Sequence, residues 1–74
     1  MTTTATDSHV QIDAVVKNLE SEDPIARMFA AGTLGNKGEQ AKEHLPAIKK
    51  LLNDPEKNVR DAAADAIKKI EKGG

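Results

Sequence analysis

The sequence predicts an all-α protein made of two stacked antiparallel helical hairpins, four helices in total. Apolar residues recur at helical spacing, and proline or glycine separates the helical stretches. The chain also matches itself, without a gap, when it is shifted by 33 residues. Because no stretch alternates with period two, no strand is expected.

The composition limits both the fold and the function. The 74 residues allow one small domain, and a single Phe without Trp or Tyr predicts an aliphatic core. The absence of cysteine excludes disulfides and thiolate catalysis. A net charge of −1 predicts no polyanion partner, and no apolar run reaches the length of a membrane span. We therefore expect a cytoplasmic protein that does not associate with membranes.

The expected organisation is a tail followed by one domain. Residues 1–7 are rich in threonine and are expected to form a disordered tail. Residues 8–72 are expected to form a single two-repeat domain, with repeat one at 8–36 and repeat two at 38–72.

Caps and stops define the first hairpin. Ser8 and Gln11 form a capping box for a helix at about 9–20, and Asp23-Pro24 suits the start of a second helix.

That second helix is expected at about 24–34, followed by a glycine-rich stop at 35–38. Gly32 lies inside it, so either a neighbouring backbone approaches closely there or the helix is weakened.

In the second hairpin, a third helix is expected at about 39–53 and a fourth at about 56–71. Pro46 lies within the third, so this helix either kinks there or has its regular part beginning nearby. Its apolar stripe is predicted to be Ala41, Leu45, Ile48 and Leu52.

The self-match at 33 residues superimposes Arg27 on Arg60 and the two Ala-Ala pairs on each other. Such a period indicates a solenoid, in which each hairpin buries its surface against its neighbour. Small residues would let the backbones of neighbouring helices approach. The residues predicted to pack the repeats together are Ala30, Ala31, Leu34, Ala63, Ala64 and Ile67.

Residues 23–70 resemble the HEAT-repeat family, particularly the short bacterial and archaeal repeats that also occur in phycobilisome lyase-type proteins. The resemblance consists of an acidic turn, an apolar residue with Arg, an Ala-Ala pair and then a large aliphatic residue. It implies a minimal α-solenoid that binds a protein or peptide through its groove or its uncapped helical ends. Since two repeats leave both ends open, a homodimer or association with a longer array is also expected.

Two alternatives stay open for the charged residues. Arg27 and Arg60 either form structural salt bridges, with Asp23 and Asp54 as the nearby acids, or line a groove that binds an acidic partner. Lys49 and Lys50 begin the one basic concentration, which extends over the third and fourth helices. Acids are interspersed there and no aromatic residue is available for base stacking, so nucleic acid is not the expected partner.

No residue pattern indicates catalysis, a metal site or a cofactor site. His9 and His44 lack a second ligand at helical spacing, and neither Ser8 nor Ser21 stands in a nucleophile motif. We therefore expect a protein that is not an enzyme and has no cofactor. By family resemblance alone, the enzyme-associated alternative is an accessory subunit of a bilin-lyase-like assembly.

Overall fold

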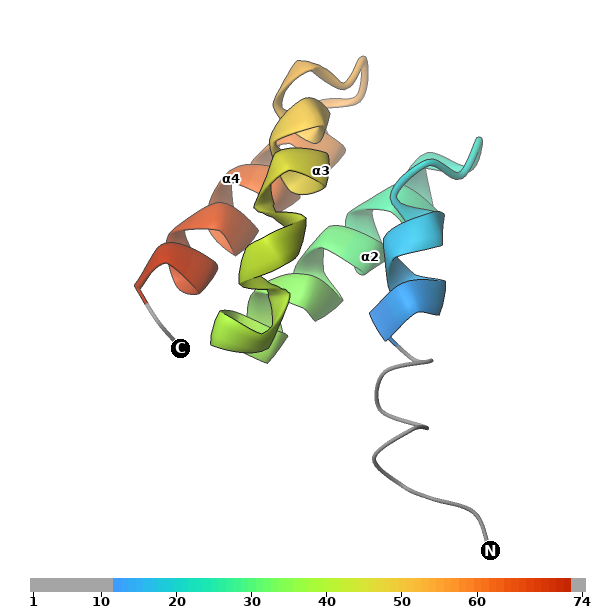
Figure 1. Ribbon diagram of the computed structural model, residues 1–74. Helices are drawn as coiled ribbons and strands as arrows, with labels where there is room; N and C mark the ends of the chain where they lie inside the picture. Colours follow the sequence, from blue (N-terminus) through green and yellow to red (C-terminus); the bar gives the residue numbers. More distant parts are fainter. Residues whose placement is uncertain (1–11, 73–74) are drawn as a thin grey trace, which may run out of the picture.

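The computed structural model describes residues 12–72, and within that range every regular element is helical (Figure 1). The helices are α2 (Pro24–Lys37), α3 (Leu45–Lys50) and α4 (Lys57–Glu71), preceded by a helical stretch at 12–18. None of the helices in the described range is long and apolar enough to cross a bilayer.

Some sequence-based expectations fall on residues outside the described range. These are the tail at 1–7, the capping box of Ser8 and Gln11, the start of the first helix, and His9.

Helix α2 begins as its cap residues predict and ends later than expected. The Asp23 carboxylate accepts a hydrogen bond of 2.9 Å from the backbone N–H of Ile25, and Pro24 occupies the first turn. The predicted end at residue 34 is wrong, because α2 continues to Lys37. It stops at Gly38, whose φ of 59° is a left-handed conformation that glycine adopts without strain.

Gly35 lies inside α2 because another backbone approaches it closely. A Cβ atom added at Gly35 would lie 2.9 Å from the Cα atom of Ala66 in α4. By contrast, a Cβ at Gly32 would have no neighbouring atom within 4 Å. The predicted close approach of a neighbouring backbone to Gly32 is therefore wrong. The close approach occurs at Gly35 instead.

The third predicted helix is not one continuous α-helix. A 3₁₀ helix at Gly38–His44 leads into α3, and a second 3₁₀ helix follows at Leu51–Asn53. Pro46 lies in the first turn of α3, where its missing N–H costs nothing, so the regular helix begins beside it. A 3₁₀ helix repeats every three residues, and this change of period buries Leu51 while it leaves Leu52 exposed, which corrects the predicted stripe.

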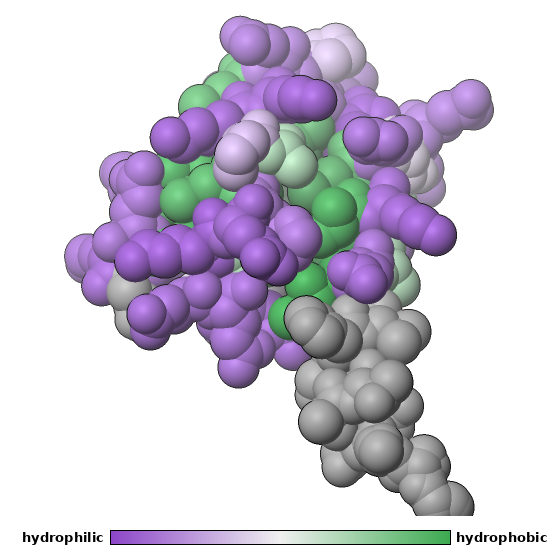
Figure 2. All heavy atoms as spheres, viewed as in Figure 1, coloured by the Kyte–Doolittle hydropathy of each residue, from purple (hydrophilic) through white to green (hydrophobic). Residues whose placement is uncertain are grey.

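The core lies where α2, α3 and α4 meet, and its largest fully buried side chains are Leu34, Ile48, Val59 and Ile70. Helices α2 and α4 run side by side in the same direction (Figure 1): Ile25 and Val59 near their starts line one pocket, and Gly35 near the end of α2 meets Ala66 of α4. Polar side chains cover much of the face in Figure 2, with apolar side chains visible between them.

Five of the six predicted packing residues are buried: Ala30, Ala31, Leu34, Ala63 and Ile67. Ala64 is exposed, so its assignment as a packing residue is wrong. Its equivalent in the first repeat, Ala31, is fully buried. The physical reason is that Ala64 lies on the outer side of α4, which no helix of the described residues covers.

Substitution of Gly35 by Ala tests the close approach between α2 and α4. The added methyl group must displace the backbone at Ala66, so we expect a loss of about 1–3 kcal/mol in the free energy of unfolding. The matched control is Gly32→Ala, which has open space and should stabilise the protein by up to about 1 kcal/mol. Urea denaturation followed by circular dichroism measures both. Equal effects of the two substitutions would contradict the assignment.

Candidate functional site

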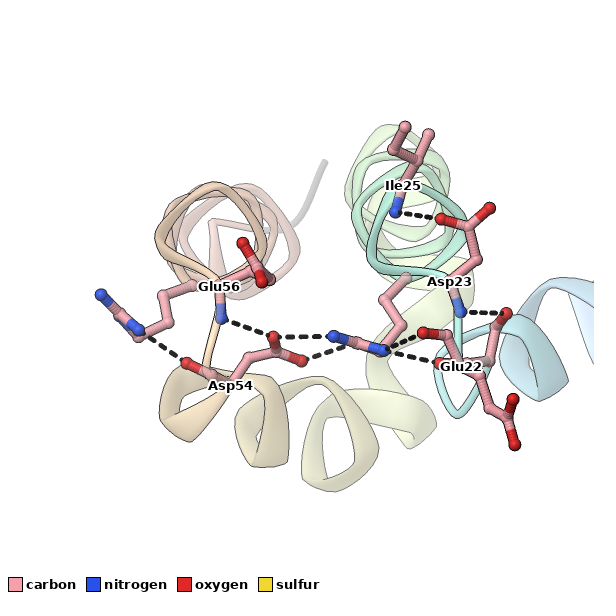
Figure 3. A network of polar contacts seen from close by, with 8 residues as sticks. Glu22, Asp23, Ile25, Asp54 and Glu56 are labelled. Atoms are coloured by element: carbon pink, nitrogen blue, oxygen red, sulfur yellow. Dashed lines mark hydrogen bonds and ion pairs between the residues drawn. The ribbon is translucent and has the colours of Figure 1, made fainter.

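Arg27 joins the turn before α2 to the turn before α4 (Figure 3). Its Nε atom donates to Oδ2 of Asp54 at 2.7 Å, and its Nη2 atom donates to Oδ1 at 3.0 Å. Its Nη1 atom donates to the backbone oxygens of Ser21 at 2.7 Å and Glu22 at 3.2 Å. One guanidinium group therefore binds a carboxylate of the second repeat and two carbonyl groups of the first.

Asp54 is the buried charged residue of the described core, at 7% exposure. The hydrogen bonds from Arg27 lower the pKa of its carboxyl group; burial opposes this shift, and a hydrogen bond of 3.0 Å from the Glu56 backbone N–H supports it. The same pairing with Asp54 raises the pKa of Arg27. Both groups are therefore held in their charged forms.

Arg60 repeats half of this arrangement. Its Nη1 atom donates to the backbone oxygen of Asp54 at 2.7 Å, as Arg27 does to Ser21, and each carbonyl lies six residues before its arginine. Ser21 and Asp54 are themselves equivalent, because the side chain of each accepts the backbone N–H two residues later. Within residues 12–72, no carboxylate forms an ion pair with Arg60.

The acids that lie closest in sequence to Arg27 and Arg60 are not their ion-pair partners. Asp23 was expected to pair with Arg27, but its carboxylate instead caps α2. The carboxylate of Asp54 binds Arg27, while Arg60 contacts only the backbone oxygen of that residue. The 33-residue self-match contained a signal for this, since it places Ser21 and Asp54 at one position but gives only the second repeat a carboxylate.

The lysines of α3 and α4 lie among acids. Lys49 lies 3.9 Å from the Glu71 carboxylate, and Lys49 and Lys50 are both exposed. Further along, Lys57 pairs with Asp61 at 2.9 Å and Lys69 with Asp65 at 3.4 Å. The lysines that the sequence singled out are thus not assembled with Arg27 into one basic site. Among the described residues, no group of three possible ligands could hold a metal ion.

An apolar surface between α2 and α4 was missed from the sequence. Ile25 and Phe29 lie one turn apart on α2 and are 57% and 66% exposed. Ile25 also borders a pocket of about 140 Å³, lined by Pro24, Ile25, Met28, Glu56, Asn58 and Val59. We call these six residues together with Phe29 the α2–α4 groove. The available signal was that Ile25 and Phe29 fall outside the Ala-rich packing stripe of their helix.

The model of the HEAT repeats family matches residues 12–73. The chain therefore belongs to the HEAT-repeat family, in agreement with its parallel α2 and α4 and its repeated arginine contacts. Comparisons with curated proteins and with solved structures give no significant match.

Asp54 should make the stability of the protein depend on acid. Because the pKa of Asp54 is lowered from 3.8 on folding, its contribution is complete above about that pH and is lost as the pH falls towards the folded-state pKa. Asp54→Asn should therefore be less stable at neutral pH and show a shallower loss in acid.

Urea midpoints measured on both sides of pH 3.8 test this expectation. Asp61→Asn, which removes an exposed carboxylate, is the control and should keep the acid dependence of the original chain. If Asp54→Asn lost stability in acid as steeply as that control, Asp54 would not be the responsible group.

Proposed function

We propose that the protein is a non-catalytic protein-binding module, built as a minimal solenoid of two hairpins and four helices, that takes its partner in the α2–α4 groove. The observation that carries the proposal is the exposure of Ile25 and Phe29, with Ile25 at a pocket that Pro24, Met28 and Val59 also line. Single exposed apolar residues are common on protein surfaces. Here an aromatic side chain, an isoleucine and a half-buried methionine adjoin, and aromatic residues and methionine are enriched in interfaces.

The size and lining of the pocket support a protein partner over a small-molecule substrate. About 140 Å³ is well below the roughly 300–1,000 Å³ of small-molecule sites, but it admits one side chain. Its lining contains one ionisable group, Glu56, and no histidine, serine or lysine. This lining offers no nucleophile with an adjacent base, which supports a role in binding rather than catalysis.

The repeat equivalence favours the groove over the outer side of α4. Gly35, which lets α4 approach α2, corresponds to Lys68 on α4, and Met28 corresponds to Asp61. A further hairpin or a second copy stacked in register on α4 would meet Lys68 where the first repeat has no side chain. Terminal repeats of solenoids typically carry such a polar outer face. A homodimer through this end therefore has less support than binding in the groove.

The other hollow at the surface is less suited to a partner. It measures about 520 Å³ but is lined only by charged side chains at the end of α4: Asp65, Lys68, Lys69, Glu71 and Lys72. The alternative of nucleic-acid binding also has little support. Three lysines of α3 and α4 already lie near carboxylates, which reduce the positive charge available to a phosphate backbone. The bilin-lyase-like alternative is supported only by the family resemblance.

Affinity capture from a native lysate treated with nuclease tests this function. Tagged protein should recover a defined protein partner, and the double substitution Ile25→Ser with Phe29→Ser should abolish the recovery. Leu52→Ser is the matched control, because Leu52 is also exposed but lies outside the groove. Equal recovery by all three proteins, or loss of every partner on nuclease treatment, would refute the proposed surface.

A further inference from the structure

We propose that the α2–α4 groove recognises a peptide segment in which an apolar side chain is followed closely by a lysine or arginine. This inference rests on the proposed function and adds the chemistry of the partner. It combines two features of the groove: a pocket with a partly apolar lining that fits one side chain, and a carboxylate in that lining, that of Glu56, which forms no ion pair within the described residues.

The pocket supplies the apolar half of the recognition. Its apolar lining consists of Pro24, Ile25 and Met28 from α2 and Val59 from α4. The volume of about 140 Å³ fits a single aliphatic or methionine side chain. Phe29, one turn further along α2, extends the apolar surface beyond the pocket. A peptide would therefore anchor one residue in the pocket and cover the Phe29 ring with the next part of its chain.

Glu56 supplies the charged half. It lines the pocket and is exposed, at the start of α4. Figure 3 shows the Ile25 side chain directed away from the polar network. Glu56 forms no ion pair within the described residues.

The nearby cations have other partners. Arg27 binds the Asp54 carboxylate, Lys57 binds Asp61, and Arg60 donates to the backbone oxygen of Asp54. The two helix N-termini beside the groove would by themselves favour an anion. Asp23, however, already accepts a backbone N–H of α2, and Asp54 accepts the N–H of Glu56 at the start of α4. Arg60 has no carboxylate partner among the described residues, but it does not line the pocket. Glu56 is the one ionisable group of the lining, so the charge at the pocket itself is negative and complements a basic residue.

Selection from a phage-displayed library of random peptides tests the inference with the full chain as bait. The Ile25→Ser, Phe29→Ser double variant serves for counter-selection. We expect enrichment of peptides in which an apolar residue precedes Lys or Arg. Enriched peptides that are apolar but show no basic preference, or an acidic one, would overturn the inference and leave the proposed function standing. Failure to enrich any peptide that depends on the groove would overturn both.

Fluorescence anisotropy with the most enriched peptide then separates the two halves of the site. Phe29→Ser should weaken binding by about 30-fold or more, as expected for an interface anchor. Glu56→Lys should weaken it by about two- to fivefold at low salt, and by less at high salt, as expected for an exposed charge.

The last measurement reverses the charge of the peptide and of residue 56 together and compares the affinities. A peptide with its basic residue replaced by glutamate should regain affinity for the Glu56→Lys variant, while Leu52→Ser should bind like the original chain. Circular dichroism establishes that each variant is folded. Unchanged affinity of folded Glu56→Lys for the basic peptide, at low salt, would overturn the assignment of Glu56 as the partner of the basic residue.

Discussion

The contact between Arg27 and Asp54 sets the relation between the two repeats. It fixes the turn before α4 to the turn before α2 through a two-point contact and two additional hydrogen bonds to carbonyl groups. A buried carboxylate is costly unless it is paired, and Arg27 provides the paired charge for Asp54. With the two turns joined, α2 and α4 start at one level and run in the same direction. The approach of Gly35 to Ala66 and the α2–α4 groove both follow from that register.

The sequence predicted what depends on local spacing. It predicted the all-helical class, the cap at Asp23 and the burial of Leu34 and Ile67, because each follows from helical periodicity or from neighbouring residues. The 33-residue self-match and the resemblance predicted the family. It failed where a distant segment decides the outcome. The carboxylate that binds Arg27 lies 27 residues away in the sequence. Glycine is required at position 35 because the backbone of Ala66 leaves no room for a Cβ atom. Neighbouring residues alone predicted an ion pair between Arg27 and Asp23, and they predicted that Gly35 belongs to the end of the helix.

The differences between the two repeats are as informative as their similarity. Five positions that are apolar or glycine in α2 are polar or charged in α4, namely Pro24 and Lys57, Ile25 and Asn58, Met28 and Asp61, Gly32 and Asp65, Gly35 and Lys68. Met28 and Gly35 of the first repeat thus lie towards α4, whereas their equivalents Asp61 and Lys68 are exposed. This asymmetry supports binding at the groove rather than growth of the array beyond α4. It could not be interpreted from sequence before the packing faces of both helices were known.

A double-mutant cycle between Arg27 and Asp54 is the most direct test of this account. The free energy of unfolding would be measured by urea denaturation for Arg27→Gln, for Asp54→Asn and for the double variant. If the contact joins the repeats, each single substitution destabilises the protein strongly, and the double variant is less destabilised than the sum of the two. Strictly additive losses would show that the two side chains act independently, and the register of α2 and α4 would then have to depend on packing alone.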